Sequence, residues 1–303
     1  MLTRYVQRDL TWIDLVTPTP GEVRALMREF DIDPLIAEEL LVPSFKPKVE
    51  RRGEMIYVIL HFPMLASHGS RPEQEVDFII GRHFLITARY GAVDPLHTFA
   101  KAFEVNSLLR HDLSMTHGGH LFATMAQNLY QALRYELEVL DRRLENIEEH
   151  IFTGDERKMV VEISQTGRTI HDFRQLLLPH QEMLVSLLQP ATKLFGPEYA
   201  YYVRGIEGAF ERVRGMLEHL RESLIELRET NNSLLSTKQN EIMKTFTVLA
   251  FITLPLTLIT GIFGMNTRYT PLICNAGDFW IVIGMMMVVG IGFVAYFIRK
   301  GWL

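Results

Sequence analysis

The sequence has little cysteine, no dense cluster of basic residues and no apolar run near its start. Its single cysteine, Cys274, excludes a disulfide framework and a zinc site built from several cysteines. With 31 Lys and Arg against 36 Asp and Glu, and a net charge of −5, the chain gives no electrostatic reason to expect nucleic acid as a partner. Arg4, Arg8, Asp9 and Asp14 interrupt the first 20 residues, so we expect no signal peptide and a cytoplasmic N-terminus.

Charge is nearly absent from the C-terminal part of the sequence. Between residues 245 and 298 the only charged residues are Arg268 and Asp278. Two uncharged apolar runs, 245–263 and 279–298, each have the roughly 20 residues that a helix needs to cross the hydrocarbon core of a bilayer. We therefore predict two transmembrane helices. The alternative is a buried apolar hairpin of a water-soluble protein, which rarely places two such runs side by side after a charged chain.

Basic residues are more numerous on one side of the two predicted transmembrane helices than on the other. Lys238 and Lys244 precede the first helix, Arg299 and Lys300 follow the second, and the connecting loop 264–278 is net neutral. Positive residues favour the cytoplasmic side of a membrane. We therefore expect both chain ends, including the tail 299–303, in the cytoplasm, and the loop 264–278 on the outer, periplasmic side.

The charged part of the sequence begins with a mixture of strands and helices. β-Branched and aromatic side chains concentrate in three runs that predict strands, at 55–62, 76–80 and 83–88. Two short helices are predicted, each with a proline at or near its first turn, at 20–30 and 34–41. We therefore predict an α+β cytoplasmic domain over residues 1–118.

From about residue 119 the pattern becomes helical. Apolar residues at helical spacing predict one helix over 121–152 and a second over 156–188. Pro179 is expected to kink the second helix, and Gln189-Pro190 to end it. These predicted helices form an antiparallel helical segment, 119–196.

A third helix is predicted to begin near Pro197, and the sequence has no strong helix breaker before Pro255. If this helix continues through the first apolar run, it is a stalk over 197–263 whose last part, about 245–263, is the first transmembrane helix. Its apolar residues recur every three or four positions, as in a coiled coil, at Val203, Ile206, Phe210, Val213, Leu217, Leu220, Leu224, Leu227 and Leu234, with Asn231 at the one polar position. This seam predicts packing against other helices.

The same spacing shifted by two residues, about 200° around a helix, gives a second stripe. Its first half is acidic and then hydroxylic, and it includes Glu222, Glu226 and Glu229. Its second half is small, mildly polar or apolar, and comprises Asn240, Met243, Thr247, Ala250, Leu254, Thr257 and Gly261. Copies of this stripe around an axis would form an acidic vestibule and a narrow uncharged pore. Two alternatives stay open: the carboxylates form a solvated helix face, and the small residues serve close helix packing.

A tripeptide at the end of the first apolar run connects the chain to a known family. Gly264-Met265-Asn266 follows directly on that run, and the second run is followed by Lys300, Trp302 and Leu303. The stretch MKTFTVLAFITLPLTLITGIFGMN, residues 243–266, resembles the CorA family of divalent-cation channels. Other segments that resemble the family are TWIDLVTPT at 11–19, PKVERRGEMIYVILHFP at 47–63 and LLLPHQEML at 176–184. The resemblance covers almost the whole chain.

This resemblance implies a funnel-shaped homopentamer in which each stalk helix lines a pore and the second transmembrane helix lies outside it. Gly264, Met265 and Asn266 would form the periplasmic mouth, where a ring of Asn266 amides meets the hydrated ion. The family's pore positions would fall at Asn240, Met243, Leu254 and Thr257. Mg²⁺ sheds water reluctantly, so neutral amide oxygens that hydrogen-bond to its water shell select it without stripping it.

The function that the resemblance implies is passive transport of Mg²⁺, and also of Co²⁺ or Ni²⁺, across the inner membrane of a bacterium or archaeon. The transported divalent cation would be a substrate, and no cofactor is expected. No enzyme is expected either, because the sequence has no nucleophile elbow, phosphate-binding loop or zinc-protease helix.

Two other functions stay open. Many family members follow the tripeptide with an acidic loop, whereas here Arg268 comes two residues after Asn266 and Asp278 is the loop's only acid. The alternative within transport is therefore a Zn²⁺ transporter of the ZntB type. The alternative outside transport is a membrane-anchored coiled-coil sensor or scaffold that conducts nothing. Such a scaffold gives no reason for Thr257 to lie on the same helix face as Asn240.

Overall fold

The computed structural model of the protein describes residues 1–303 except 45, 66–72, 92–93, 109–116, 266–276 and 303. The chain forms two compact units. The N-terminal unit comprises Met1–Arg228, and the C-terminal unit comprises Glu229–Leu303.

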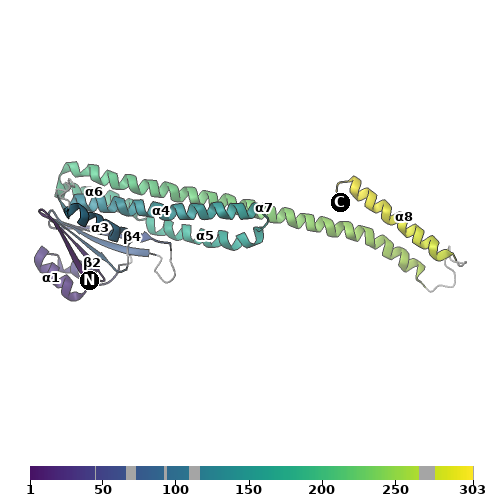
Figure 1. Ribbon diagram of the computed structural model, residues 1–303, viewed down its shortest axis with the longest axis horizontal. Coiled ribbons are helices and arrows are strands. Elements are labelled where there is room, and N and C mark those ends of the chain that lie inside the picture. Colours follow the sequence, from purple (N-terminus) through teal and green to yellow (C-terminus); the bar gives the residue numbers. More distant parts are fainter. Residues whose placement is uncertain (45, 66–72, 92–93, 109–116, 266–276, 303) are drawn as a thin grey trace. The chain divides into compact units, whose positions relative to one another are not determined.

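The N-terminal unit is built around a six-stranded sheet (Figure 1). In spatial order its strands are β1 (Leu2–Gln7), β2 (Leu10–Val16), β6 (Phe84–Arg89), β5 (Glu73–Ile80), β4 (Met55–Pro63) and β3 (Lys48–Arg52). The neighbours β2 and β6, second and third in this order, are parallel, with Asp14 opposite Thr87, and the other neighbouring strands are antiparallel. The three predicted strands are confirmed as β4, β5 and β6.

Side chains alternate between the two faces of the sheet, and helices cover both faces. On one face, Tyr57, Ile79 and Ile86 share a core with α1 (Pro20–Phe30) and α2 (Pro34–Glu39). On the other face lie α3 (Asp94–Leu108) and α4 (Gly118–Phe152). Trp12 meets Phe103 of α3 at a ring-centroid distance of 5.6 Å, and Phe78 meets Phe122 of α4 at 5.1 Å. The result is a three-layer α+β fold.

The predicted helices at 20–30 and 34–41 are confirmed as α1 and α2, the second ending two residues earlier. Thr19 and Glu22 form a capping box at the start of α1: the Thr19 hydroxyl accepts from the Glu22 N–H, and the Glu22 carboxylate accepts from the Thr19 N–H at 2.9 Å. These bonds satisfy two groups that a helix start otherwise leaves unpaired. Asp31 ends the helix in the left-handed region, with φ of 51°.

The sequence pattern did not predict β1, β2, β3 or α3. The strands β1 and β3 are edge strands with short, largely polar sequences, and their pairing depends on neighbours that no local pattern reveals. In β2 the charged Asp14 interrupts the apolar run. The structure accommodates this carboxylate because Arg89, at the end of the parallel neighbour β6, donates to it at 2.8 Å.

Long helices form the rest of the N-terminal unit, where α4, α5 (Glu156–Leu177), α6 (His180–Phe195) and the first part of α7 (Ala200–Phe263) lie side by side (Figure 1). Ion pairs join α4 to α5 through Arg143 and Glu162 at 2.8 Å, and α5 to α7 through Arg174 and Glu218 at 3.4 Å. The predicted helix 121–152 is confirmed as α4, which begins three residues earlier.

The prediction of one kinked helix over 156–188 was wrong. The chain forms two helices, α5 and α6, with Pro179 at the start of the second, and α6 continues through Pro190 to Phe195. Pro190 does not end the helix because the buried apolar spacing continues on both sides of it, at Met183, Leu184, Leu187, Ala191 and Leu194. The burial of this face offsets the cost of a proline inside a helix, where the lost hydrogen bond and the clash of the ring with the preceding turn together amount to about 3 kcal/mol.

The predicted third helix is confirmed. A short 3-10 helix at Pro197–Tyr199 leads into α7, which runs without a break through the first apolar run and past Pro255 to Phe263. The seam from Val203 to Leu227 is buried, as is Asn231, whereas Leu234 is half-buried. The apolar spacing therefore identified the packed face of α7.

The C-terminal unit contains the last part of α7 and α8 (Asp278–Arg299), which confirms the predicted second apolar helix. Both helices are long and apolar enough to cross a membrane, and only 6% of the most apolar 18-residue window of each is buried. A buried hairpin in the core of a water-soluble protein would require these windows to be covered by the chain. In this structure they are exposed.

Candidate functional site

The predicted pore stripe lies on the exposed face of α7 within the C-terminal unit. Leu254 is 68% exposed and Met243 is 58% exposed. The other stripe members from Asn240 onward are also exposed, except Thr247, which is half-buried. The stripe is thus free to contact water, lipid or another copy of the chain.

A different face of α7 packs against α8. Val248 is buried, and half-buried residues follow it at helical spacing, at Ile252, Leu256, Ile259 and Phe263. Phe251 and Phe297 lie 6.2 Å apart between their ring centroids, and Leu256 approaches Gly290. Since Leu254 and Leu256 are separated by about 200° around the helix, the stripe beyond Thr247 points away from α8.

Threonine side chains on the apolar part of α7 bond back to their own helix. The Thr247 hydroxyl donates to the Met243 carbonyl at 2.8 Å, and the Thr257 hydroxyl donates to the Thr253 carbonyl at 2.9 Å. Each proton is therefore used within the helix, which satisfies the hydroxyl in an apolar surrounding. The hydroxyl oxygen of Thr257 still has free lone pairs, so it is able to accept a hydrogen bond from a water molecule at the stripe.

The acidic half of the stripe is exposed. Glu222, Glu226 and Glu229 are all exposed, while the alternating seam residues Leu224 and Leu227 are buried. Among the described residues none of these three carboxylates has an ion-pair partner within 4.0 Å. Their charges are therefore not neutralised by a neighbouring side chain of the described chain.

The helix α7 ends just before the tripeptide predicted to form the outer mouth. Gly264 N donates to the Thr260 carbonyl at 2.8 Å, and Met265 N donates to the Ile262 carbonyl at 3.4 Å. Gly264 and Met265 are exposed. Asn266, the residue predicted to meet the ion, lies outside the described residues, as does Arg268.

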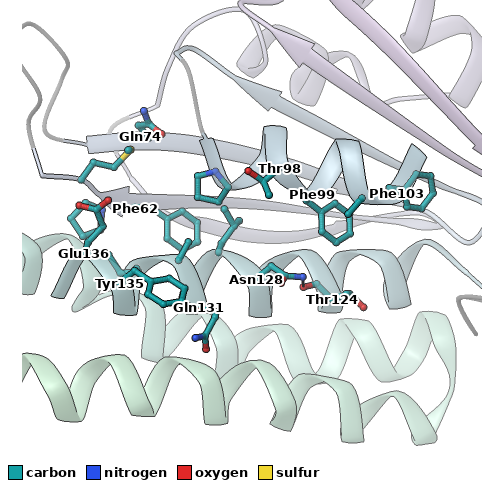
Figure 2. Close-up of a pocket in the computed structure, with 17 residues that line it drawn as sticks. Phe62, Gln74, Thr98, Phe99, Phe103, Thr124, Asn128, Gln131, Tyr135 and Glu136 are labelled. Carbon is teal, nitrogen blue, oxygen red and sulfur yellow. Dashed lines mark hydrogen bonds between the residues drawn. The ribbon is translucent and has the colours of Figure 1, made fainter. Parts of the chain in front are cut away.

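A cavity of about 710 Å³ opens within the N-terminal unit and contains none of the predicted site residues. Figure 2 shows Phe99 and Phe103 of α3 on one side of it, and Thr124, Asn128, Gln131 and Tyr135 along α4 on the other. Its lining is mainly apolar, with Glu136 at one end.

The structure also assembles buried titratable groups that the sequence did not group together. Asp77 of β5 accepts hydrogen bonds from Tyr57 at 3.0 Å and Tyr90 at 3.2 Å, and burial, followed by the charge of Glu75, raises the pKa of Asp77 well above its ordinary value. On α6, burial lowers the pKa of His180 to about 4. These residues come from distant parts of the chain, so no local motif could reveal them.

Metal-binding side chains do not converge in the described part of the chain. No group of three or more His, Cys, Asp or Glu side chains that could hold a metal ion occurs among the described residues. His61, on β4, and His83, directly before β6, are therefore not in such a group.

Comparison with known proteins identifies the family. The family model for the CorA-like Mg²⁺ transporter protein matches residues 7–300. The chain belongs to the CorA family. The CorA family consists of membrane transporters and channels, so the expectation that the chain is not an enzyme is confirmed by its family.

Curated CorA relatives match this chain over nearly its whole length. The cobalt/magnesium transport protein CorA of Thermotoga maritima is 26% identical over 97% of this chain and 83% of the relative. A putative metal ion transporter of Bacillus subtilis, YfjQ, is 25% identical over 99% of this chain and 93% of the relative. The chain thus spans most of the length of both relatives.

A solved structure supports the same fold. The complete structure of the CorA magnesium transporter from Methanocaldococcus jannaschii matches with a TM-score of 0.85 at 23% identity, covering 99% of this chain and 93% of that one. The structure of the full-length CmaX protein matches with a TM-score of 0.66 at 16% identity. The CorA fold, with an α+β domain, a long helix and two C-terminal apolar helices, therefore describes this chain.

Proposed function

We propose that this chain forms a homopentameric pore that passes hydrated Mg²⁺, and also Co²⁺ or Ni²⁺, across the inner membrane along the electrochemical gradient. In this assembly, residues 1–118 and 119–196 are the cytoplasmic domain and helices, 197–263 is the stalk and first transmembrane helix, 264–278 is the periplasmic loop, and 279–298 is the second transmembrane helix. The tail 299–303 returns to the cytoplasm. Membership of a family of Mg²⁺ transporters and two exposed apolar helices support this assignment.

The observation that carries the proposal is the direction of the stripe on α7. Its small and mildly polar side chains are exposed on a face turned away from α8, in the most apolar part of the chain. A membrane-anchored scaffold gives no reason to align small and mildly polar side chains on one exposed face of a membrane helix, even though the threonine protons are satisfied within that helix. Five copies that turn this face inward would place it around a shared axis.

The chemistry of the stripe suits an ion that keeps its water. Water bound to Mg²⁺ points its protons outward, and groups that accept hydrogen bonds are needed to receive them. The Thr257 oxygen is available for this role because its own proton is donated to the Thr253 carbonyl. Asn240 would offer a neutral amide oxygen at the cytoplasmic end of the pore. Glu222, Glu226 and Glu229, exposed and without neutralising partners in the described chain, would raise the local cation concentration below it.

Ion influx into liposomes that contain the purified full-length protein tests this proposal. Asn266→Ala removes the amide predicted to receive the hydrated ion at the outer mouth, and we expect it to abolish Mg²⁺ influx while the protein still assembles. The matched control is Asn275→Ala, which removes the same amide from the same loop and should leave influx intact. Equal influx through wild type and Asn266→Ala would reject the role assigned to the tripeptide.

The same liposomes distinguish the transported ion. We expect Mg²⁺ influx to be inhibited by Co²⁺ and Ni²⁺ and to persist without a pH gradient. Influx of Zn²⁺ without influx of Mg²⁺ would establish the ZntB-type alternative. Absence of flux for all four ions would favour the alternative of a non-conducting scaffold.

A further inference from the structure

A groove lies between α7 and α8, close to the C-terminal end of α8. It encloses about 680 Å³ within the C-terminal unit. Its walls are apolar and aromatic, with Phe251 on α7 and Val289, Gly292 and Phe293 on α8. Of the predicted pore stripe, Thr247 alone appears among the described residues that line it. The groove is therefore largely separate from the proposed pore.

The end of the groove nearest the C-terminus is cationic. Lys300 lines it, and its ammonium nitrogen lies 5.7 Å from the centre of the Tyr296 ring and 5.6 Å from that of the Trp302 ring. Nearby, Lys244 Nζ donates to the Gly301 carbonyl at 2.9 Å. Among the described residues neither lysine has a carboxylate partner within 4.0 Å. Positive charge at this end is thus not balanced by an acidic side chain of the described chain.

The aromatic residues around Lys300 match the chemistry of a membrane interface. Tyr and Trp side chains favour the headgroup level of a bilayer, where one part of the ring contacts hydrocarbon and the polar group contacts water. Lysine extends its charged end toward the same level. Phe297 is buried and stacks on Trp302 with ring centroids 5.9 Å apart, which closes the apolar wall directly beneath this polar end. The groove therefore runs from an interfacial, cationic end into an apolar interior.

We propose that this groove binds one anionic phospholipid of the cytoplasmic leaflet, with an acyl chain beside Phe251 and Gly292 and the phosphate at Lys300. The inference rests on the proposed membrane insertion of α7 and α8, and it does not depend on ion conduction. In a bilayer the surrounding solvent is lipid, so an apolar groove open to it fills with an acyl chain. The unbalanced lysines select a headgroup with net negative charge.

A bound lipid at this place would also act on the helices. Its acyl chain would fill the space between α7 and α8 below the tryptophan and hold the two helices at a fixed separation. Thr247 borders the groove and also belongs to the pore stripe. The lipid would therefore contact α7 near the cytoplasmic end of the proposed pore.

Two pairs of matched variants test the site. Lys300→Gln removes the charge at the groove, whereas Arg299→Gln removes the same charge from the neighbouring residue, which does not line it. Gly292→Leu places a side chain in the groove, and Gly284→Leu places the same side chain elsewhere on α8. A Cβ added at either glycine meets no other atom within 4 Å, so both substitutions fit the helix.

The measurement is native mass spectrometry of the full-length protein in detergent, titrated with phosphatidylglycerol or with phosphatidylcholine of the same acyl chains. We expect tighter binding of phosphatidylglycerol to wild type. Lys300→Gln should weaken that binding about fivefold, the factor expected for one cation near an anionic headgroup, while Arg299→Gln leaves it unchanged. Gly292→Leu should remove binding of both lipids, and Gly284→Leu should not.

Several results would overturn the proposal. Equal affinity for the two lipids, or equal loss in Lys300→Gln and Arg299→Gln, would show general attraction to a charged surface. Equal binding to Gly292→Leu and Gly284→Leu would place the acyl chain elsewhere. No lipid bound to the assembled wild-type protein would indicate that a neighbouring subunit fills the groove. Because no ion gradient is used, none of these outcomes depends on whether the protein conducts ions.

Discussion

Tyr130 and His180 share a hydrogen bond of 2.8 Å inside the N-terminal unit, where both side chains are fully buried. The other ring nitrogen of His180, Nε2, lies 3.0 Å from the carbonyl oxygen of His61. A carbonyl only accepts, so Nε2 carries the proton and Nδ1 accepts from the Tyr130 hydroxyl. The neutral ring is thus satisfied at both nitrogens, and a second proton, on Nδ1, would remove the acceptor of the buried Tyr130 hydroxyl proton.

This arrangement predicts that acid destabilises the N-terminal unit. Burial lowers the pKa of His180 to about 4 from 6.5, so the unfolded chain binds the proton more readily than the folded one. Stability is then complete above pH 6.5 and falls as the pH drops toward 4, by about 3 kcal/mol in total. We expect the melting temperature of the full-length protein to decrease over this range and the decrease to be smaller in His180→Gln.

The matched control is His171→Gln, which replaces an exposed histidine of α5. This variant should keep the wild-type dependence on pH. If His180→Gln and wild type lose stability in parallel between pH 6.5 and pH 4, another group causes the acid sensitivity.

A second prediction concerns the ion pair between Asp14 and Arg89. Both residues are buried, at 4% and 8% exposure, and Asp14 also accepts a hydrogen bond from Thr87 at 2.8 Å. Arg89→Met leaves the Asp14 carboxylate buried without its cation, and we expect a loss of about 3–5 kcal/mol in the free energy of unfolding. Urea denaturation followed by tryptophan fluorescence measures this loss. The double variant Asp14→Val, Arg89→Met should recover part of it, and failure to do so would show that packing of the arginine stem dominates.

A third prediction concerns the acidic half of the stripe. Replacing Glu222, Glu226 and Glu229 together by Gln should reduce cation flux most at low ionic strength, since salt screens such a field over about 10 Å at 0.1 M. The control replaces three exposed carboxylates of α4, Glu145, Glu148 and Glu149, by Gln, with the same change of net charge. A reduction in flux that is independent of salt, or that is equal in the control, would indicate that the three residues form an ordinary solvated helix face.

The sequence predicted the elements whose signals are local. The spacing from Val203 to Leu227 identified the buried face of α7, and the charge gap after Lys244 identified both apolar helices. Elements that depend on distant partners were missed or divided wrongly. Strand β2 was not predicted because it contains the charged Asp14, whose partner Arg89 is 75 residues away. A helix end was predicted at Pro190 because the tertiary packing that keeps α6 intact is not visible in the local sequence.

The candidate site shows the same limit. Periodicity alone placed Leu254, Thr257 and Gly261 on one face of α7, but it could not tell which face meets α8. That relation required the positions of Val248, Phe251 and Phe297 in space. The lysine and aromatic residues of the lipid groove are likewise split between two helices, so neither helix alone predicts them.

The central claim is that the exposed stripe on α7 lines a water-filled pore. Leu254 and Leu249 test it as a matched pair, because both are exposed in the single chain, at 68% and 56%, and only Leu254 belongs to the stripe. Each is replaced by cysteine in a Cys274→Ser background, and Mg²⁺ influx into liposomes is measured before and after a water-soluble, bulky thiol reagent is added. We predict that the reagent blocks influx through Leu254→Cys and leaves Leu249→Cys unaffected. Unchanged influx through Leu254→Cys, or an equal block in both variants, would contradict the account.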